Sequence, residues 1–212
     1  KDKNKKYVIF HTLYGRRVND VLSRVIAYII SRINHRDVEV GINDNGFYIS
    51  CEKAMQAVKA IKMIKTNELE DIAKISIDKS EILRRRFRHC AARSLMILRQ
   101  YKGKKKGVGR QQVSSMILLN AVRRIDNNFP ILMEARREIL EDLMDIKNAK
   151  IVISGIENNS TKIKEISTDV PSPFAFNIIS QSYTDVLKIE DKIEFLKRMH
   201  KKVQEMIKDK ES

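Results

Sequence analysis

The sequence is poor in residues that interrupt helices or cross-link chains. Its 212 residues include 7 Gly, 3 Pro and 2 Cys, and no Trp. So few glycines and prolines favour long helices joined by short connections. Cys51 and Cys90 lie far apart in the sequence, with no CxxC motif or histidine pair nearby, which argues against a disulfide framework and a zinc site. This cysteine usage suits a reducing compartment, and we expect a cytoplasmic protein.

Three further absences narrow the possible functions. No apolar run approaches the ~20 residues that a membrane-spanning helix needs, and no secretory signal opens the chain, so we expect no membrane partner. No GxxxxGK[ST] motif is present, so this segment does not bind ATP through a P-loop. The four histidines have no metal-binding spacing, and we predict no metal site and no catalytic residues. These histidines are His11, His35, His89 and His200.

Acidic residues are missing from residues 82–125, and this gap accounts for the charge of the whole chain. The sequence has 42 Lys+Arg against 27 Asp+Glu, a formal net charge of +15. Residues 82–125, which we call the basic segment, contain 13 of the positive charges and no Asp or Glu; the other residues contain 29 positive and 27 negative charges. A positive field concentrated in one segment points to a polyanionic partner.

The basic segment is predicted to form a helix, a loop and a second helix. On a wheel of about 100° per residue, one face of the first helix is apolar and turns inward, and arginines occupy the other faces. The inward positions are Leu83, Phe87, Cys90, Ser94, Leu98 and Tyr101. Arginine suits phosphate because its planar fork can donate two hydrogen bonds at once. The loop from Lys102 to Arg110 contains three glycines, so its backbone can adapt to a strand and offer N–H groups to phosphate.

A second interpretation of these cations stays open at this point. Basic helix faces are often solvated, or they pair with acids elsewhere in the fold. Acidic residues lie close downstream and can neutralise several of the arginines. They are Asp126, Glu134, Glu138, Glu141 and Asp142.

Hydrophobic spacing predicts an α+β fold with a small N-terminal sheet. Strand-like runs at 7–11, 38–42 and 47–49 surround a helix that starts after Gly15 and has apolar residues every three or four positions. The Asn45-Gly46 dipeptide predicts a tight hairpin turn. We therefore expect a β-α-β-β subdomain at 1–51 and a helical subdomain at 52–212. Its expected helices are 53–63, 68–76, 79–101, 110–125, 130–146, 147–157 and an amphipathic C-terminal helix at 188–208, with a weak strand at 162–166 and a buried turn at 171–176.

Several strings together resemble the large helicase-related (Lhr) ATP-dependent helicases of superfamily 2, in their archaeal form. They are FHTLYGRRVND (10–20), DVEVGINDNGFYIS (37–50), RRRFRHCAARSLMILRQYKGKKKGVGRQQ (84–112), LEDLMDI (140–146) and TDVPSPFAFNII (168–179). The resemblance runs over almost the full chain. It implies a C-terminal domain that follows two RecA-like lobes and a winged helix, with a fold similar to AlkZ-type DNA glycosylases. The first residue is Lys1 rather than Met, which also leads us to expect a piece of a longer polypeptide.

The resemblance implies a role beside a motor that moves along nucleic acid. The expected partners are single-stranded DNA or RNA, or a DNA:RNA hybrid, together with the RecA-like and winged-helix domains of the same polypeptide. ATP and Mg²⁺ are expected in those motor domains and no cofactor in this segment. Combining the family strings with the basic segment, we predict these nucleic-acid-binding residues: Arg16, Arg17, Asn19, Arg84, Arg85, Arg86, Arg88, Arg93, Arg99, Lys102, Lys104, Lys105, Lys106, Arg110, Gln111 and Gln112. For Arg17, Gln111 and Gln112 a structural role is an equal or stronger alternative.

Two other functions are weighed against nucleic-acid binding. The first is a scaffold that docks on the motor or on a partner protein, whose signature would be an apolar patch beside the basic face. The second is a glycosylase-like DNA repair domain, which needs a polar group that positions water at a flipped nucleotide. Asp44, Gln111 and Gln112 are the candidates for that group. A shared fold does not by itself transfer this activity.

Overall fold

The computed structural model describes residues 6–52, 55–168 and 171–182, and the C-terminal residues 194, 196, 197, 199–201, 203–205, 207 and 208. The described elements form a small sheet with helices around it and a separate helical projection. In chain order they are β1 (Lys6–His11), α1 (Arg16–Asn34), β2 (Glu39–Ile42), β3 (Gly46–Cys51), α2 (Ala57–Lys62), α3 (Leu69–Asp78), α4 (Glu81–Arg93), β4 (Gln100–Tyr101), β5 (Lys104–Lys105), α5 (Val108–Ile125), α6 (Pro130–Arg137), the π-helix η1 (Glu138–Leu143), α7 (Ile146–Glu157) and α8 (Pro173–Ser182).

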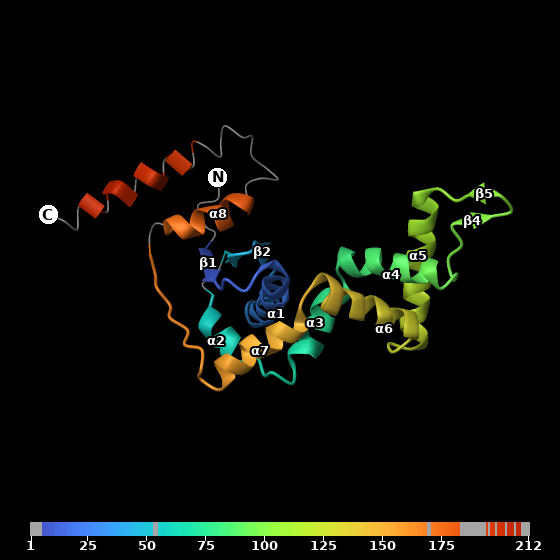
Figure 1. Cartoon of the computed structure of the whole chain (residues 1–212), viewed down its shortest axis with the longest axis horizontal. Helices are drawn as coiled ribbons and strands as arrows, with labels where there is room; N and C mark the ends of the chain where they lie inside the picture. The colour runs from blue at the N-terminus through green and yellow to red at the C-terminus, as the bar shows by residue number, and fades with distance from the viewer. Residues whose placement is uncertain are drawn as a thin grey trace.

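The sheet is antiparallel in the order β1-β3-β2 and has helices on both faces. Its central strand β3 is buried along its whole length, because α1 covers one face and α8 packs against the other (Figure 1). Phe47 and Ile49 join the apolar stripe of α1 in the main core. Gly41 on β2 is needed where it stands, since a Cβ there would lie 2.0 Å from the Tyr48 ring. The expected α+β class, with a small sheet and a helical majority, is confirmed.

The chain divides into two parts that Figure 1 shows clearly. The body consists of β1–β3, α1–α3, α7 and α8, and the arm consists of α4, β4, β5, α5 and α6, residues 81–137. Within the arm, α4 packs against both α5 and α6, and the β4–β5 hairpin extends from the end farthest from the body. The π-helix η1 contacts α4, α6 and α7, so it lies at the junction of arm and body.

The helix expected at 79–101 is shorter than predicted. It begins after Ser80, whose side-chain oxygen accepts a hydrogen bond from the Leu83 N–H, and ends at Arg93. The predicted inward residues Leu83, Phe87 and Cys90 are buried, but Ser94 and Leu98 are exposed and Ile97 is buried instead. The reason is that Leu95 adopts a left-handed backbone conformation, with φ 59°, and turns the chain out of the helix.

The predicted loop at 102–110 is largely a β-hairpin and the start of α5. Tyr101 pairs with Lys104 across a two-residue turn, and both turn residues have positive φ, 46° at Lys102 and 76° at Gly103. Positive φ at both positions is the type I′ pattern that suits the twist of a hairpin, and glycine favours it. The Lys-Gly dipeptide was therefore the signal that sequence reasoning missed.

The single helix expected at 130–146 is an α-helix up to Arg137 and a π-helix from Glu138. Pro130 occupies the first turn of α6, where a missing N–H costs nothing. From Glu138 the helix widens into η1 and ends before Met144, and α7 begins at Ile146. Apolar periodicity does not separate a π-helix from an α-helix over so few residues, so this change could not be predicted from the sequence.

Two predictions near the C-terminal end are wrong and one lies largely outside the described residues. Residues 162–166 form no strand, and the buried turn expected at 171–176 is the start of α8, with Phe174 83% exposed. Much of the helix expected at 188–208, including Ile189 and Ile193, is not described; the described residues of that range are helical. Among the described residues, no helix is both long and apolar enough to span a membrane.

Candidate nucleic-acid interface

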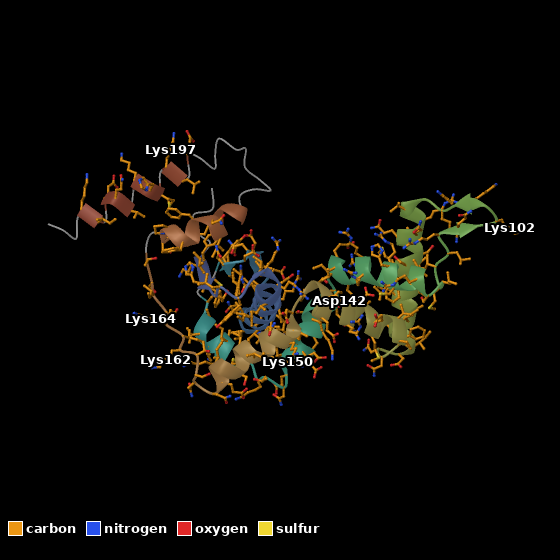
Figure 2. The ribbon with its side chains drawn as sticks, viewed as in Figure 1. Lys102, Asp142, Lys150, Lys162, Lys164 and Lys197 are labelled. Carbon is orange, nitrogen blue, oxygen red and sulfur yellow. The ribbon has the colours of Figure 1, made fainter. Side chains whose placement is uncertain are left out.

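The basic segment lies almost entirely on the arm. Figure 2 shows side-chain nitrogens along α4, α5 and the hairpin, with Lys102 at the far tip. Eight of the 13 cations make no ion pair or hydrogen bond through their side chains to any described residue. They are Arg85, Arg88, Arg99, Lys104, Lys105, Lys106, Arg110 and Arg124. Because all of these except Arg88 are exposed and Arg88 is half-buried, their charges face solvent from both the helices and the hairpin.

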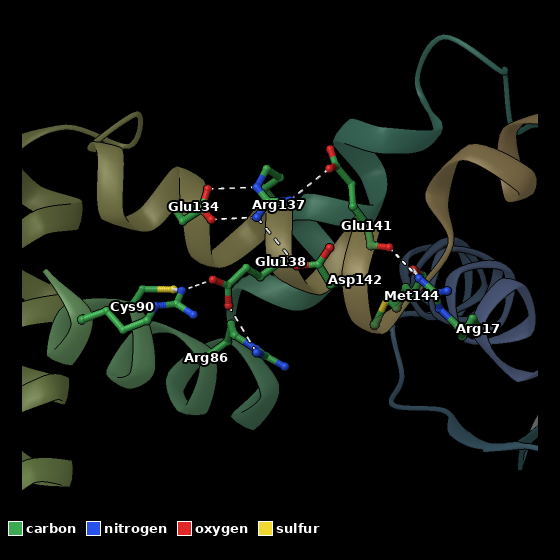
Figure 3. Close-up of polar contacts among 10 residues, drawn as sticks. Arg17, Arg86, Cys90, Glu134, Arg137, Glu138, Glu141, Asp142 and Met144 are labelled. Carbon is green, nitrogen blue, oxygen red and sulfur yellow. Dashed lines mark hydrogen bonds and ion pairs between the residues drawn. The ribbon is translucent and has the colours of Figure 1, made fainter.

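Three arginines of the basic segment instead hold the arm together. Arg86 and Arg93 both donate to the buried carboxylate of Glu138, at 3.2 Å for Arg86 (Figure 3). Arg123 donates to the backbone carbonyl of Asp78 at the end of α3. The alternative of internal pairing thus describes these three arginines, although the Arg93 side chain is still 57% exposed.

The other acidic residues considered as partners do not neutralise the basic segment. Arg137 of α6, outside that segment, binds Glu134, Glu141 and Asp142, at 2.7, 3.3 and 3.7 Å. Asp126 accepts a hydrogen bond from the Asn128 N–H. Arg84 pairs weakly with Glu81, at 3.4 Å and with both side chains at least half exposed. Such an exposed pair contributes little and can exchange for a phosphate.

His89 lies among the free arginines of α4. Burial lowers its pKa first, and the positive charges around it lower it further. Those charges belong to Arg88, Arg86, Arg99 and Arg85, in decreasing order of effect. With its pKa below the ordinary value, the imidazole is neutral near pH 7, first because it is partly buried and further because of the positive field of these four arginines.

The lowered pKa of His89 predicts that nucleic-acid binding takes up a proton. Phosphate placed among the arginines offsets their field and raises the pKa of His89, so affinity should increase as pH falls from about 7.5 to about 5.5 at constant salt. Fluorescence anisotropy with a labelled oligonucleotide measures this. The His89→Gln variant should show a flat profile over the same range. An unchanged affinity in the unmodified protein would mean that phosphate does not bind near His89.

Two residues at the start of α1 that were predicted to bind nucleic acid, Arg17 and Asn19, make hydrogen bonds within the fold. Asn19 is fully buried; its amide donates to the carbonyls of Asn43 and Asp44 at 2.9 and 3.2 Å, and its carbonyl accepts from Thr12 Oγ1 at 2.7 Å. The Arg17 guanidinium donates to the carbonyls of Glu141 and Met144, at 2.6 and 2.9 Å (Figure 3). Asn19 is thus inaccessible to nucleic acid, and Arg17 ties α1 to the end of η1.

Arg16 and Arg17 are both exposed, and Arg16 is the one whose side chain makes no hydrogen bond or ion pair to a described residue. Gly15, with φ 83°, gives the chain the turn that precedes α1 and directs Arg16 outward. Arg16 borders a cleft of about 570 Å³ on the body, which Tyr14, Asp44 and Ile151 also line. This cleft is on the body, whereas the free cations of the basic segment lie on the arm.

The candidates for glycosylase chemistry are not brought together. Asp44 lies in the turn between β2 and β3 on the body, whereas Gln111 and Gln112 lie on α5 of the arm. The Gln111 side chain donates to the carbonyl of Lys106 at 2.8 Å and so fastens the hairpin to α5. Gln112 is exposed. These residues do not form one pocket.

The cysteines and histidines do not gather into a metal-binding cluster in the described part of the chain. No group of three or more His, Cys, Asp or Glu there can hold a metal ion. Burial raises the pKa of the Cys90 thiol, although Arg93 contacts its sulfur at 3.4 Å. A protonated, buried thiol is a poor nucleophile.

Comparison with known proteins agrees with the fold. Residues 1–175 match the family model described as DEAD/H associated. The chain is 51% identical to the ATP-dependent helicase Lhr-Core of Methanothermobacter thermautotrophicus, covering 96% of this chain and 24% of that protein. It is 45% identical to the Sulfolobus acidocaldarius protein of the same name, covering 99% and 24%. Its structure resembles that of Mycobacterium smegmatis helicase Lhr bound to ssDNA and AMP-PNP, with a TM-score of 0.71 and 29% identity over 82% of this chain and 22% of that one.

Because the family model matches most of the chain, the chain belongs to the DEAD/H associated family. Within that class, its sequence and fold correspond to a region of Lhr-type helicases. The predicted resemblance is therefore confirmed. The chain spans about a quarter of the length of the curated relatives it matches.

Proposed function

We propose that this chain is a nucleic-acid-contacting accessory region of an Lhr-type ATP-dependent helicase, and that the arm holds the backbone of the strand along which the motor moves. One observation supports this proposal above the others. The basic segment contains no Asp or Glu, and eight of its cations make no side-chain ion pair or hydrogen bond to any described residue. They lie on α4, on α5 and in and beside the hairpin between these helices. Lysines and arginines that neutralise phosphates supply most non-specific affinity for nucleic acid.

The arrangement favours backbone contact over base recognition. The free cations are spread over two helices and a hairpin, so they can follow successive phosphates instead of converging on one base. The chain has few aromatic residues and no Trp, which leaves little surface for base stacking. A region of a moving helicase has to bind every sequence that passes, and phosphate contacts carry no sequence information.

The experiment is a salt series on the hairpin lysines. Lys104, Lys105 and Lys106, all changed to Gln, should reduce the steepness of log K against log[salt] by roughly 2, since each phosphate contact to a single strand contributes about 0.7. Fluorescence anisotropy with an unstructured single-stranded oligonucleotide measures both affinity and slope. Affinity should fall alike for oligonucleotides of different sequence.

A matched control removes the same charge from the body. The three exposed lysines Lys147, Lys162 and Lys164, changed to Gln, lower the net charge equally but lie off the arm. They should leave the slope nearly unchanged. Equal losses in the two triple variants would show that net charge alone attracts the nucleic acid and that the hairpin is not a contact.

A further inference from the structure

The outer face of α5 is apolar and uncovered. This helix packs on α4 through Ser115, Leu119 and Val122, which are buried. On the face turned away from α4, Val113 and Ile117 are 58% and 65% exposed, and Met116 at the edge of that face is 43% exposed. An amphipathic surface helix normally presents polar residues to water, and a cluster of exposed apolar side chains, here a short stripe, can mark a surface that another molecule covers.

Positive charges border this stripe at both ends. Arg110 and Arg124 are exposed and fall on the same face, because 110, 113, 117 and 124 follow the three- and four-residue spacing of one helix face. The two arginines are 14 positions apart in the sequence, which corresponds to about 21 Å along the helix at ~1.5 Å per residue. The sequence of α5 contains no Asp or Glu. The surface is therefore complementary to a partner of similar length that is apolar along its centre and acidic at its ends.

Two other occupants fit this surface less well. Nucleic-acid bases stack on aromatic rings, whereas the exposed side chains here are aliphatic. A second copy of the chain would bring one acid-free basic segment against another, and like charges at an interface oppose association. An amphipathic helix with acidic ends satisfies both the apolar stripe and the arginines.

We propose that the outer face of α5 docks an acidic amphipathic helix from another region of the same helicase polypeptide. This inference rests on the proposed function, because the curated relatives are about four times as long as the match to this chain. The docked helix lies along Val113, Met116 and Ile117, with carboxylates at Arg110 and Arg124. Docking at this face fixes the arm relative to the motor and takes Arg110 and Arg124 out of the set of strand-contacting cations. The six others, on α4 and around the hairpin, stay open to the strand.

Photo-crosslinking in the full-length helicase polypeptide tests the docking. A benzoylphenylalanine at position 117 should link to a peptide outside residues 1–212, and the same group at Ile75 serves as the control. Ile75 is an isoleucine of comparable exposure, 53%, on α3 of the body. The yield at position 117 should exceed that at 75 by about fivefold, and Arg110→Glu with Arg124→Glu should remove that excess. Equal yields, links between two copies, or links to nucleic acid alone would overturn the proposal.

Two further measurements separate this proposal from others. Lys104, Lys105 and Lys106 changed to Gln should leave the crosslink at position 117 unchanged, whatever they do to nucleic-acid affinity, so docking and strand contact can fail independently. In the isolated 212-residue chain, Ile117→Glu should shift the melting temperature by less than about 2 °C, as for an exposed site. A larger loss would mean that Ile117 packs within the chain and is not a docking residue.

Discussion

Replacing Glu138 by Ala should destabilise the protein by about 3 kcal/mol and lower its melting temperature by roughly 6–12 °C. Glu138 is 4% exposed and faces two arginines of α4, so its removal leaves Arg86 and Arg93 without their counter-ion. Breaking a buried ion pair from one side typically costs ~3–5 kcal/mol, and the lower end applies here because Arg93 stays partly hydrated. Urea denaturation followed by circular dichroism gives the free energy of unfolding.

Two controls identify the source of this loss. Glu138→Gln keeps the shape and hydrogen-bonding capacity but not the charge, so it should recover only part of the stability. Glu134→Gln removes a carboxylate from an exposed pair with Arg137 on the same helix, and should cost far less stability than Glu138→Ala. If Glu138→Ala and Glu134→Gln cost the same, the buried carboxylate is not what joins α4 to η1.

Replacing Asn19 by Ala should cost about 3 kcal/mol, although this position was expected to contact nucleic acid. The side chain has no exposed surface and makes three hydrogen bonds, two as donor and one as acceptor. Each buried hydrogen bond contributes about 1 kcal/mol net, and the missing volume adds a cavity term. Differential scanning calorimetry of the variant measures the change.

A double-mutant cycle with Thr12 tests this assignment. Thr12→Ala alone removes one hydrogen bond and should cost about 1 kcal/mol, and the two substitutions together should cost less than their sum by a similar amount. Nucleic-acid affinity measured well below the melting temperature should stay the same in all three variants. A selective loss of affinity in Asn19→Ala would restore the predicted contact role.

The sequence predicted the elements whose signal is local, and it missed those that depend on distant partners. Apolar spacing located α1, and Asn45-Gly46 indicated the place of the turn between β2 and β3, because both patterns act over a few residues. The kind of turn was not predicted: Asn45 and Gly46 lack positive φ, and the Asn43 side chain closes the turn by accepting from both of their N–H groups. The buried role of Asn19 depends on carbonyls 24 and 25 residues away, and a polar side chain beside two arginines looks the same in sequence whether it faces solvent or the core.

The candidate interface was foreseen as a segment but not as a set of residues. The absence of acids in residues 82–125 identified the cationic region, and eight of its cations are free. Sorting Arg86, Arg93 and Arg123 from the others required the positions of Glu138 and Asp78, which lie 45 to 52 residues from the arginines that they bind. The order of charges along the sequence does not show which acid meets which arginine in the fold.

The arm is anchored at one end, and this has a mechanical consequence. Its hairpin lies at the end farthest from the body, while Glu138, Arg17 and Asp78 make contacts at its base. When a structure is held at one end, a force applied at the other end produces the largest bending moment at the support. Any pull of a strand on the lysines of the hairpin is therefore resisted at the base, by the ion pairs of Glu138 and by the backbone contacts of Arg17 and Arg123, so the stiffness of the arm depends on residues far from the hairpin.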